Sequence, residues 1–503
     1  MEKAATMVMS RRRRWSLLAT VSSALLLIAL DNSILYTALP TLNRELDADG
    51  SASLWIINAY PVVMAGLLLG AGTLGDRVGH VRMFRTGLVI FGVASLLAAF
   101  APTATVLIAA RALLAVGAAT MMPATLALIR VTFHIERERN IAIAVWGTVS
   151  VVGAALGPIV GGALLQAFWW GAVFLINVPI VVIALVTTAL IRPANDPDPA
   201  KRWDLISSIQ AMIGLVALVV AIKEFANTTP AWPVTLLAAL ASVSALALFI
   251  RRQQRLEHPL LDFTIFTNGA FTAGVIAAAV TMFAIGGAQL VTVQRLQLVV
   301  DFTALQSGLV VSAIMLGAVP TALAGGAVLH RTGLRILISG GLALAGLGLA
   351  LSVLTFASSL PALVTGLVIT GLGLGAVIAV ASTAIVGNAP ARRAGMASSV
   401  EEVSWEFGNL TAVAFIGTLI GIVYSTALRL PPGSPEAARD SLTTALSLRE
   451  GTPELHEAAR TAFDTGYLVV MIIITVIVFA AALLTSRLLR HHGPGTPSSI
   501  QDQ

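Results

Sequence analysis

Cysteine is absent from all 503 residues, and charged residues make up only 11% of them. The absence of cysteine excludes disulfides, thiolate metal sites and cysteine nucleophiles. Because 57% of the residues are hydrophobic and the mean hydropathy is +0.89, there is too little polar material to cover a water-soluble protein of this size. The composition therefore predicts a protein that is covered largely by lipid.

Long apolar runs divide the chain into fourteen candidate membrane spans, each near the length of about 20 residues that a helix needs to cross the bilayer core. The first run is too long for a signal-peptide core and has no evident cleavage site, so we expect it to be retained. The sequence thus predicts an all-α membrane protein with both termini on one side. The runs are 15–38, 54–75, 83–100, 104–128, 139–164, 170–191, 205–222, 232–250, 269–291, 304–328, 334–355, 359–386, 396–423 and 466–486.

The basic residues support this count, because Lys and Arg accumulate in cytoplasmic loops. With the N-terminus inside, 23 of the 31 Lys and Arg fall in inside segments and 7 in outside segments, while Arg111 stays within a span. The net charge of +6 therefore indicates membrane topology rather than a nucleic-acid partner. We expect cytoplasmic tails at 1–14 and 489–503.

A short pattern occurs twice, after the second and the tenth predicted spans. It reads G-x4-R-x-G from Gly72 to Gly79 and again from Gly326 to Gly333, at an offset of 254 residues. Glycine-containing basic turns recur in many membrane proteins, but the matching position favours an internal repeat. We therefore expect a six-helix bundle at 15–192, two inserted helices at 205–251, and a six-helix bundle at 269–488 that includes an outer loop at 424–465.

Five charged residues remain in the interior of the predicted spans, away from their ends: Asp31, Arg111, Glu401, Glu402 and Glu406. Charges at that depth are costly and need a partner or a polar cavity. Glu402 and Glu406 share one helix face, so they titrate as a unit and suit proton coupling, whereas Glu401 points about 100° away. Asp31 and this pair are therefore the acids to which a positively charged ligand could bind. Arg111 serves as the partner of Asp31, as a proton-relay group, or as both.

Two further assignments remain open on the sequence alone. Glu401 is either part of the coupling site or a structural carboxylate that pairs with Arg392 or Arg393. Several large or polar side chains could line a cavity for flat cations, with ordinary packing as the alternative. They are Tyr36, Trp55, Asn58, Tyr60, Met122, Phe283 and Trp405. No Walker sequence, metal-ligand cluster or nucleophile constellation occurs, so we expect no cofactor and no enzyme activity.

Five motifs together carry a family resemblance. They are Gly72-x-Leu-x-Asp76-Arg77-x-Gly79, Gly153-x3-Gly157-Pro158-x2-Gly161-Gly162, Leu30-Asp31-x2-Ile34-x3-Ala38-Leu39-Pro40, Trp170-x3-Phe174-x2-Asn177-x-Pro179 and Glu401-Glu402-x3-Glu406-x-Gly408-Asn409. With them the chain resembles the major facilitator superfamily over essentially its whole length, specifically the fourteen-helix drug/proton antiporter family and its pumps of the QacA, SmvA and LfrA type. The first motif departs from the family pattern at His80 and Val81, where basic residues are usual.

The resemblance implies a monomeric, proton-coupled exporter in the cytoplasmic membrane, with two bundles that rock about a central site. The implied substrates are lipophilic cations: quaternary ammonium compounds, dyes such as ethidium and acriflavine, and fluoroquinolones. A proton-coupled importer, or an exporter of one small metabolite, is the alternative on the same fold, and the glycine-rich motif around Pro158 favours export. Some similar proteins carry acids at the positions of Asn58 and Ala318, so we expect monovalent cations to be exported better than divalent ones.

Overall fold

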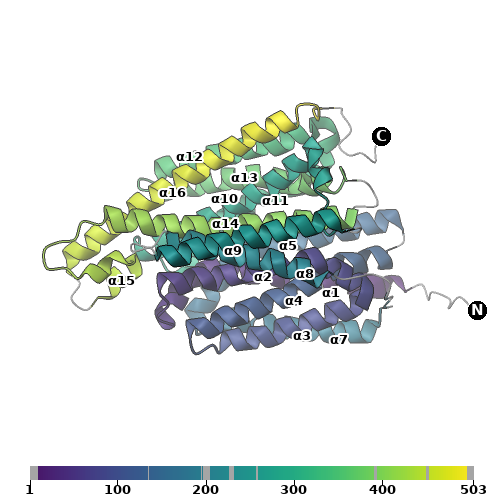
Figure 1. The fold of residues 1–503 in the computed structure, drawn as a ribbon, viewed down its shortest axis with the longest axis horizontal. Helices are drawn as coiled ribbons and strands as arrows, with labels where there is room; N and C mark the ends of the chain where they lie inside the picture. Colours follow the sequence, from purple (N-terminus) through teal and green to yellow (C-terminus); the bar gives the residue numbers. More distant parts are fainter. Residues whose placement is uncertain are drawn as a thin grey trace, which may run out of the picture.

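The computed structural model describes residues 9–133, 135–193, 195, 197, 204–225, 231–256, 259–389, 394–448 and 452–494, and within these ranges a few side chains, that of Asp76 among them, are not described. These residues form helices and connecting turns, and no strand (Figure 1). The elements are α1 (Arg11–Glu45), α2 (Gly50–Val78), α3 (His80–Ala99), α4 (Ala104–Thr132), α5 (Glu136–Ala167), α6 (Ala172–Leu175), α7 (Asn177–Ile191), α8 (Leu205–Phe225), α9 (Trp232–Arg255), η1 (Phe263–Thr267), α10 (Gly269–Leu298), α11 (Ala304–Arg335), η2 (Ile336–Gly340), α12 (Gly341–Thr355), α13 (Leu360–Ile385), α14 (Ala394–Ala427), η4 (Glu436–Arg439), α15 (Leu442–Ser447) and α16 (Pro453–Leu488).

Thirteen helical stretches of the described chain are long and apolar enough to cross a membrane. One of them, Ala304–Thr355, has 52 residues, which at 1.5 Å per residue would measure about 78 Å and exceed the bilayer core more than twofold. Its backbone leaves the helical conformation at Gly333, so it holds two crossings. The described residues therefore hold the fourteen crossings that the apolar runs predict.

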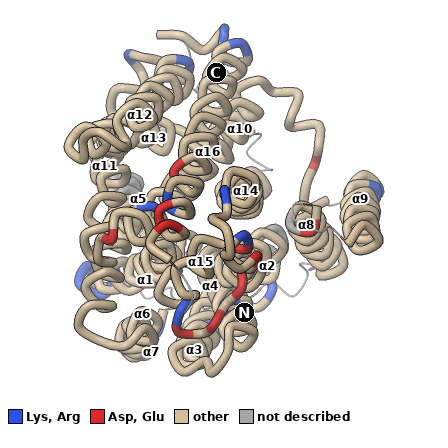
Figure 2. Tube along the Cα trace, turned by 90° about the vertical axis from the view of Figure 1, so that its left-hand side faces the viewer, with Lys and Arg blue, Asp and Glu red and all other residues tan. Residues whose placement is uncertain are grey.

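The helices form two groups, α1 to α7 and α10 to α16, and the apolar core is divided accordingly into two main clusters. Across the boundary α5 packs on α11 and α2 packs on α14. Figure 2 shows the two groups and, at one edge, the inserted pair α8 and α9. The predicted fold class, two bundles with an inserted pair, is confirmed.

The inserted pair is fastened to its neighbours by close packing and by polar contacts. A methyl group added at Gly66 of α2 would lie 2.6 Å from the Cβ of Met212 in α8, so the two helix backbones approach closely. Ahead of α8, Asp204 accepts hydrogen bonds from Arg252 at 3.0 to 3.3 Å and from the Ser207 hydroxyl at 2.5 Å. These contacts tie the start of α8 to the end of α9.

Large apolar side chains cover the outward faces of the helices. On α9, for example, Leu237 is 69% exposed. A water-soluble monomer rarely exposes so much continuous apolar surface, so these faces lie against lipid. Others include Val89, Val93, Leu97, Val182, Ile183, Val186, Leu190, Leu236, Leu240, Val243, Leu347 and Leu354.

The repeated glycine motif has the same backbone geometry in both halves. Gly79 and Gly333 have φ angles of 99° and 75°, a region that side chains with a Cβ rarely adopt. The segment after the last helix of each half covers the turn. In the first half Asn195 donates to the Val78 carbonyl at 3.2 Å, and in the second the Arg335 amide donates to the His492 carbonyl at 3.0 Å. The 254-residue offset therefore relates equivalent turns.

The two termini of the helical bundle lie at the same end, where α1 begins and α16 ends (Figure 1). We call this the cytoplasmic end, as the basic loops predict. At the opposite, outer end α14 continues to Ala427 and α16 starts at Pro453, so the connection between them is shorter than the expected 424–465. Its folded part is held by the Tyr424 hydroxyl, which donates to the Ala438 carbonyl at 2.8 Å.

Candidate functional site

Asp31, near the middle of α1, forms an ion pair with Arg111 of α4. Both side chains are only 1% exposed. The guanidinium also donates to the Ile56 carbonyl at 3.3 Å and lies 4.7 Å from the centre of the Tyr60 ring. A buried charge pair of this kind needs such additional contacts to offset its lost hydration. The structure thus places Arg111 as the direct partner of Asp31.

A third group completes this buried cluster. The Asn177 side chain, at the start of α7, donates to the second carboxylate oxygen of Asp31 at 3.1 Å and to the Ser95 hydroxyl at 3.2 Å. Asn177 belongs to a motif that the sequence analysis used only for the resemblance. Its contact with Asp31 could not be read from the sequence, because the two residues lie 146 positions apart. Four helices, α1, α3, α4 and α7, therefore meet at one polar point.

Glu402 and Glu406 lie on one face of α14, as their spacing predicts, and their side chains are partly exposed although the helix crosses the membrane. One carboxylate oxygen of Glu406 is buried and has no hydrogen-bond partner in the part of the chain that the structure describes. This carboxylate lies within electrostatic range of Arg111 and of the hydroxyls of Tyr36 and Tyr60 in the other half. The structure therefore brings Glu406 to the cluster around Asp31, across the boundary between the halves.

Glu401 has a different environment. Its carboxylate is hydrogen-bonded to Ser382 of α13 and to Trp405 one turn along its own helix. Arg392 and Arg393, the partners considered from the sequence, lie outside the described residues. Glu401 still lies close enough to Glu402 to interact with it electrostatically. Glu401 is therefore held by hydrogen bonds within the second half, whereas Glu406 lies within electrostatic range of the first half.

Three hydrogen bonds join the halves in the described part of the chain, and all lie toward the outer end. The Tyr36 hydroxyl donates to the side-chain oxygen of Asn409. Gln297 donates to the Thr37 carbonyl at 3.1 Å, and Gln166 donates to the Thr303 hydroxyl at 3.0 Å. These bonds close the outer side of the boundary between α1, α5, α10, α11 and α14.

The glycine-rich motif of α5 faces two partners. A methyl group added at Gly153, Gly157 or Gly161 would lie within 2.5 to 2.9 Å of α1 side chains, whereas one added at Gly162 would lie 2.4 Å from the Leu305 Cα of α11. A methyl group added at Gly308 of α11 would lie 2.1 Å from the Pro158 carbonyl oxygen. The motif thus packs α5 on its own half with one face and on the other half with another.

The motif from Gly72 to Gly79, at the end of α2, is described only in part. Gly72 lies within α2, and no atom lies within 4 Å of a methyl group added there. Arg77 is exposed, and the side chain of Asp76 lies outside the description. The contact that the structure adds is Asn195, whose side-chain oxygen accepts from the Val81 and Arg82 amides at 3.1 and 3.2 Å. Asn195 therefore caps α3 in place of a residue of the motif.

The candidate cavity residues separate into two groups. Tyr36, Tyr60 and Asn58 are buried near the boundary face of the first half, and neither polar side-chain atom of Asn58 has a partner. Trp55 packs against residues of α8, and Trp405 packs with Phe271 and the η1 region. The other two, Met122 and Phe283, join the main apolar clusters of the first and the second half. The tyrosines are thus the aromatic side chains placed beside Arg111 and Glu406.

Arg295, one of the seven basic residues that the topology places outside, lies within α10. It is buried, donates to Asp464 of α16 at 2.7 Å, and lies 4.7 and 5.4 Å from the ring centres of Phe356 and Tyr467. α10 continues to Leu298, beyond the apolar run that ends near 291, so Arg295 lies near the outer end of the helix. The second half therefore has an ion pair of its own, in which Arg295 is buried and Asp464 is 30% exposed.

Comparison with known proteins agrees with this geometry. The family model described as Major Facilitator Superfamily matches residues 21–293, more than half of the chain. The chain belongs to the major facilitator superfamily. A second family model, described as Sugar (and other) transporter, matches residues 263–435. The chain is therefore a multi-pass membrane transporter rather than an enzyme.

Curated relatives share the sequence over most of the chain. The identity is 36% over 461 residues with the methyl viologen resistance protein SmvA of Salmonella typhimurium, covering 90% of this chain and 93% of that protein. It is 37% over 485 residues with the multidrug efflux pump LfrA of Mycolicibacterium smegmatis, covering 93% and 95%. The resemblance to pumps of the SmvA and LfrA type is thereby confirmed.

Solved structures support the fold. A bacterial homolog of the human lysosomal transporter Spinster, in an inward-facing and unoccupied conformation, superposes with a TM-score of 0.67 at 16% identity, covering 97% of this chain and 100% of that one. A POT family transporter in complex with 5-aminolevulinic acid gives a TM-score of 0.66 at 14% identity, covering 95% and 96%. At these identities the likeness concerns the fold alone.

Proposed function

We propose that this chain is a multidrug efflux antiporter that exports lipophilic cations from the cytoplasm in exchange for protons. The substrates would be quaternary ammonium compounds, intercalating dyes such as ethidium and acriflavine, and fluoroquinolones. The similarity to the multidrug efflux pump LfrA and to the methyl viologen resistance protein SmvA supports drug efflux. The protein would work as a monomer in the cytoplasmic membrane of a bacterium, with protons, drugs and lipid as its partners.

The observation that carries the proposal is the position of Glu406. One of its carboxylate oxygens has no donor among the described residues, and the group lies within electrostatic range of Arg111 in the other half. A carboxylate in such surroundings is stabilised either by a proton or by a cation, because an unpaired buried charge is costly. With Glu402 one turn away on the same face, the site can hold a proton or a cationic drug and exchange one for the other.

Asp31 has a different place in the proposed cycle. The sequence suggested that the drug docks on Asp31 together with the pair on α14, but in this conformation Asp31 is already neutralised by Arg111. We therefore assign direct contact with the cation to Glu402 and Glu406. Asp31 and Asn177 hold Arg111 in position, and Arg111 in turn senses whether Glu406 is charged.

The conformation fits the loading step of export. The three cross-half hydrogen bonds lie toward the outer end, so a drug would reach Glu406 from the cytoplasm or the inner leaflet. Protons from outside would displace it after the halves rock. Exchange of one proton for one monovalent cation moves no net charge, and each additional proton adds about 2.3 kcal/mol per 100 mV of membrane potential.

The test is ethidium transport in inverted membrane vesicles that contain the protein. Energised vesicles should accumulate the dye, and a protonophore should abolish the accumulation. Glu406→Gln should lose it as well, while Glu454→Gln, a change of the same chemistry at the outer end of α16, should not. Accumulation that survives the protonophore would contradict proton coupling, and accumulation that survives Glu406→Gln would contradict the assigned site.

A further inference from the structure

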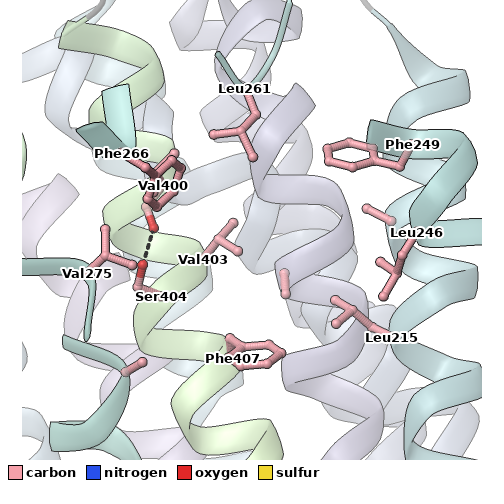
Figure 3. Close-up of a pocket in the computed structure, with 13 residues that line it drawn as sticks. Leu215, Leu246, Phe249, Leu261, Phe266, Val275, Val400, Val403, Ser404 and Phe407 are labelled. Carbon is pink, nitrogen blue, oxygen red and sulfur yellow. Dashed lines mark hydrogen bonds between the residues drawn. The ribbon is translucent and has the colours of Figure 1, made fainter. Parts of the chain in front are cut away.

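A pocket of about 260 Å³ lies between the inserted helices and the second half of the transporter. Figure 3 shows Leu215, Leu246 and Phe249 on one side of it and Val403 and Phe407 of α14 on the other. The pocket is lined by Ala65, Ala211, Leu215, Leu246, Phe249, Leu261, Phe266, Val275, Ala279, Val400, Val403, Ser404 and Phe407. Its walls therefore come from α2, α8 and α9, facing α10, α14 and the segment before η1.

The lining has no counter-charge for a cation. None of its residues is ionisable, and the one hydroxyl, that of Ser404, donates to the Val400 carbonyl at 2.6 Å. A cationic drug placed here would lose its hydration without gaining a counter-charge. The occupant must accordingly be apolar at this point.

The depth of the pocket can be judged from α9. Leu246 and Phe249 line the pocket, and the exposed Arg251 and Arg255 follow on the same helix. At 1.5 Å per residue, Phe249 lies about 3 to 9 Å from these two positions along the helix axis. Exposed arginines at a helix end reach the lipid headgroups. The pocket therefore lies in the hydrocarbon region just beneath the cytoplasmic headgroups.

The cytoplasmic end of the pocket is covered by a fixed segment. Gln253, which is 2% exposed, donates to the Ser207 hydroxyl at 2.6 Å and accepts from the Leu260 and Leu261 amides at 2.7 and 3.2 Å. These bonds hold the side chain of Leu261 at the end of the pocket. They favour an occupant that comes sideways from the bilayer over one that comes from the cytoplasm.

We propose that this pocket binds one acyl chain of a phospholipid from the cytoplasmic leaflet. The site is distinct from the drug site, because the residues of α14 that line the pocket centre on a face about 130° around the helix from Glu402 and Glu406. One wall includes Ala65 of the first half, and the opposite wall belongs to the second half. The bound chain thus fills the space between parts that move relative to each other during transport.

The experiment uses the full-length protein in bilayers that contain a phospholipid with a photoreactive diazirine on its acyl chain. After irradiation, adducts should map to 400–407 of α14 and to 211–215 of α8. Ala211→Phe, which fills the pocket from α8, should lower the adducts on 400–407 several-fold. Leu237→Phe, on the exposed face of α9, is the matched control and should leave them unchanged.

A second variant, Ala279→Leu, fills the pocket from α10 and serves if Ala211→Phe does not fold. Adducts on 400–407 that persist in a folded, filled variant would overturn the proposal, because they would come from lipid outside the pocket. Absence of these adducts from the unmodified protein would overturn it as well. Labelling of 400–407 by azido-ethidium, blocked by ethidium, would assign the pocket to drugs instead. Ethidium efflux, measured separately, shows whether the proposed function itself holds.

Discussion

Replacing Asp31 by Asn tests the buried pair with Arg111 most directly. The amide has nearly the shape of the carboxylate but carries no charge, so Arg111 is left at 1% exposure without its partner. Removal of one member of a buried ion pair costs about 3 to 5 kcal/mol. Since about 1.4 kcal/mol is a factor of ten, the folded fraction should fall by between two and four powers of ten relative to the unfolded one. We also expect export of permanently charged dyes to be lost.

A second substitution separates stability from transport. In Asp31→Asn/Arg111→Gln both charges are gone, and replacement of a whole buried pair is often close to neutral for stability. The double variant should therefore recover most of the thermal stability of the purified protein. It should not recover ethidium efflux, because Glu406 would then have no positive charge opposite it.

Two results would refute this reasoning. If Asp31→Asn melts like the unmodified protein and exports ethidium at the same rate, the ion pair has neither role. If the double variant exports at the normal rate, the charge on Arg111 is not needed for the cycle, and coupling lies in α14 alone. Efflux in cells together with unfolding of the detergent-purified protein, followed by size-exclusion chromatography, provides both measurements.

Four other predictions follow from the described contacts. Glu402→Gln and Glu406→Gln should each reduce ethidium-induced proton release from purified protein, and unchanged release in the double variant would move coupling to Asp31. Cells that express the protein should resist ethidium better than the dication methyl viologen. Asn58→Asp, which adds a charge where both side-chain polar atoms lack a partner among the described residues, should raise resistance to methyl viologen. Equal resistance to the two compounds before the substitution, or no gain for methyl viologen after it, would count against charge matching. Gly162→Ala should impair efflux because the added methyl group would meet α11, whereas Gly147→Ala in the same helix has open space and should leave efflux unchanged. Similar efflux in the two variants would contradict close packing of α5 on α11. Burial raises the pKa of Asp204, but hydrogen bonds from Arg252 and Ser207 hold that pKa below its usual value. The stability that these bonds contribute is therefore present at neutral pH and is lost as acid protonates Asp204. Arg252→Gln should lower the melting temperature at pH 7 and have less effect in strong acid, and an effect that does not depend on pH would exclude this linkage.

The fold could be predicted from the sequence because membrane spans are set by length and apolarity, and their direction by the basic loops. The acids of α14 could be predicted for a similar reason, since charges within a span are rare and need a use. Contacts between segments far apart in the chain could not be predicted from the sequence. Arg295 looks like a loop residue until Asp464, 169 positions later, is placed beside it.

Ala318 shows the same limit for the site. Ala318 corresponds to an acid in some similar proteins, which suggested a position in the cavity. In the structure Ala318 is fully buried, and methyl groups added at Gly371 and Gly375 of α13 would lie 2.9 and 2.2 Å from its backbone. An acid there would enter the packed crossing of α11 and α13. Which face of a helix meets a neighbour depends on how the helices are arranged, and that was not available from the pattern of residues along one of them.

The covered turns at Gly79 and Gly333 bear on how a fourteen-helix transporter could arise from a twelve-helix one. Each half needs the residues just after its last helix to close its own first cytoplasmic turn: Asn195 in one half, His492 and Gly493 in the other. A helical hairpin added before residue 195 would pull that closure away from the turn it covers. Added after it, the hairpin leaves both halves intact. The extra pair begins at Leu205, in the interval where an ancestral gene could have gained two helices without disturbing either half.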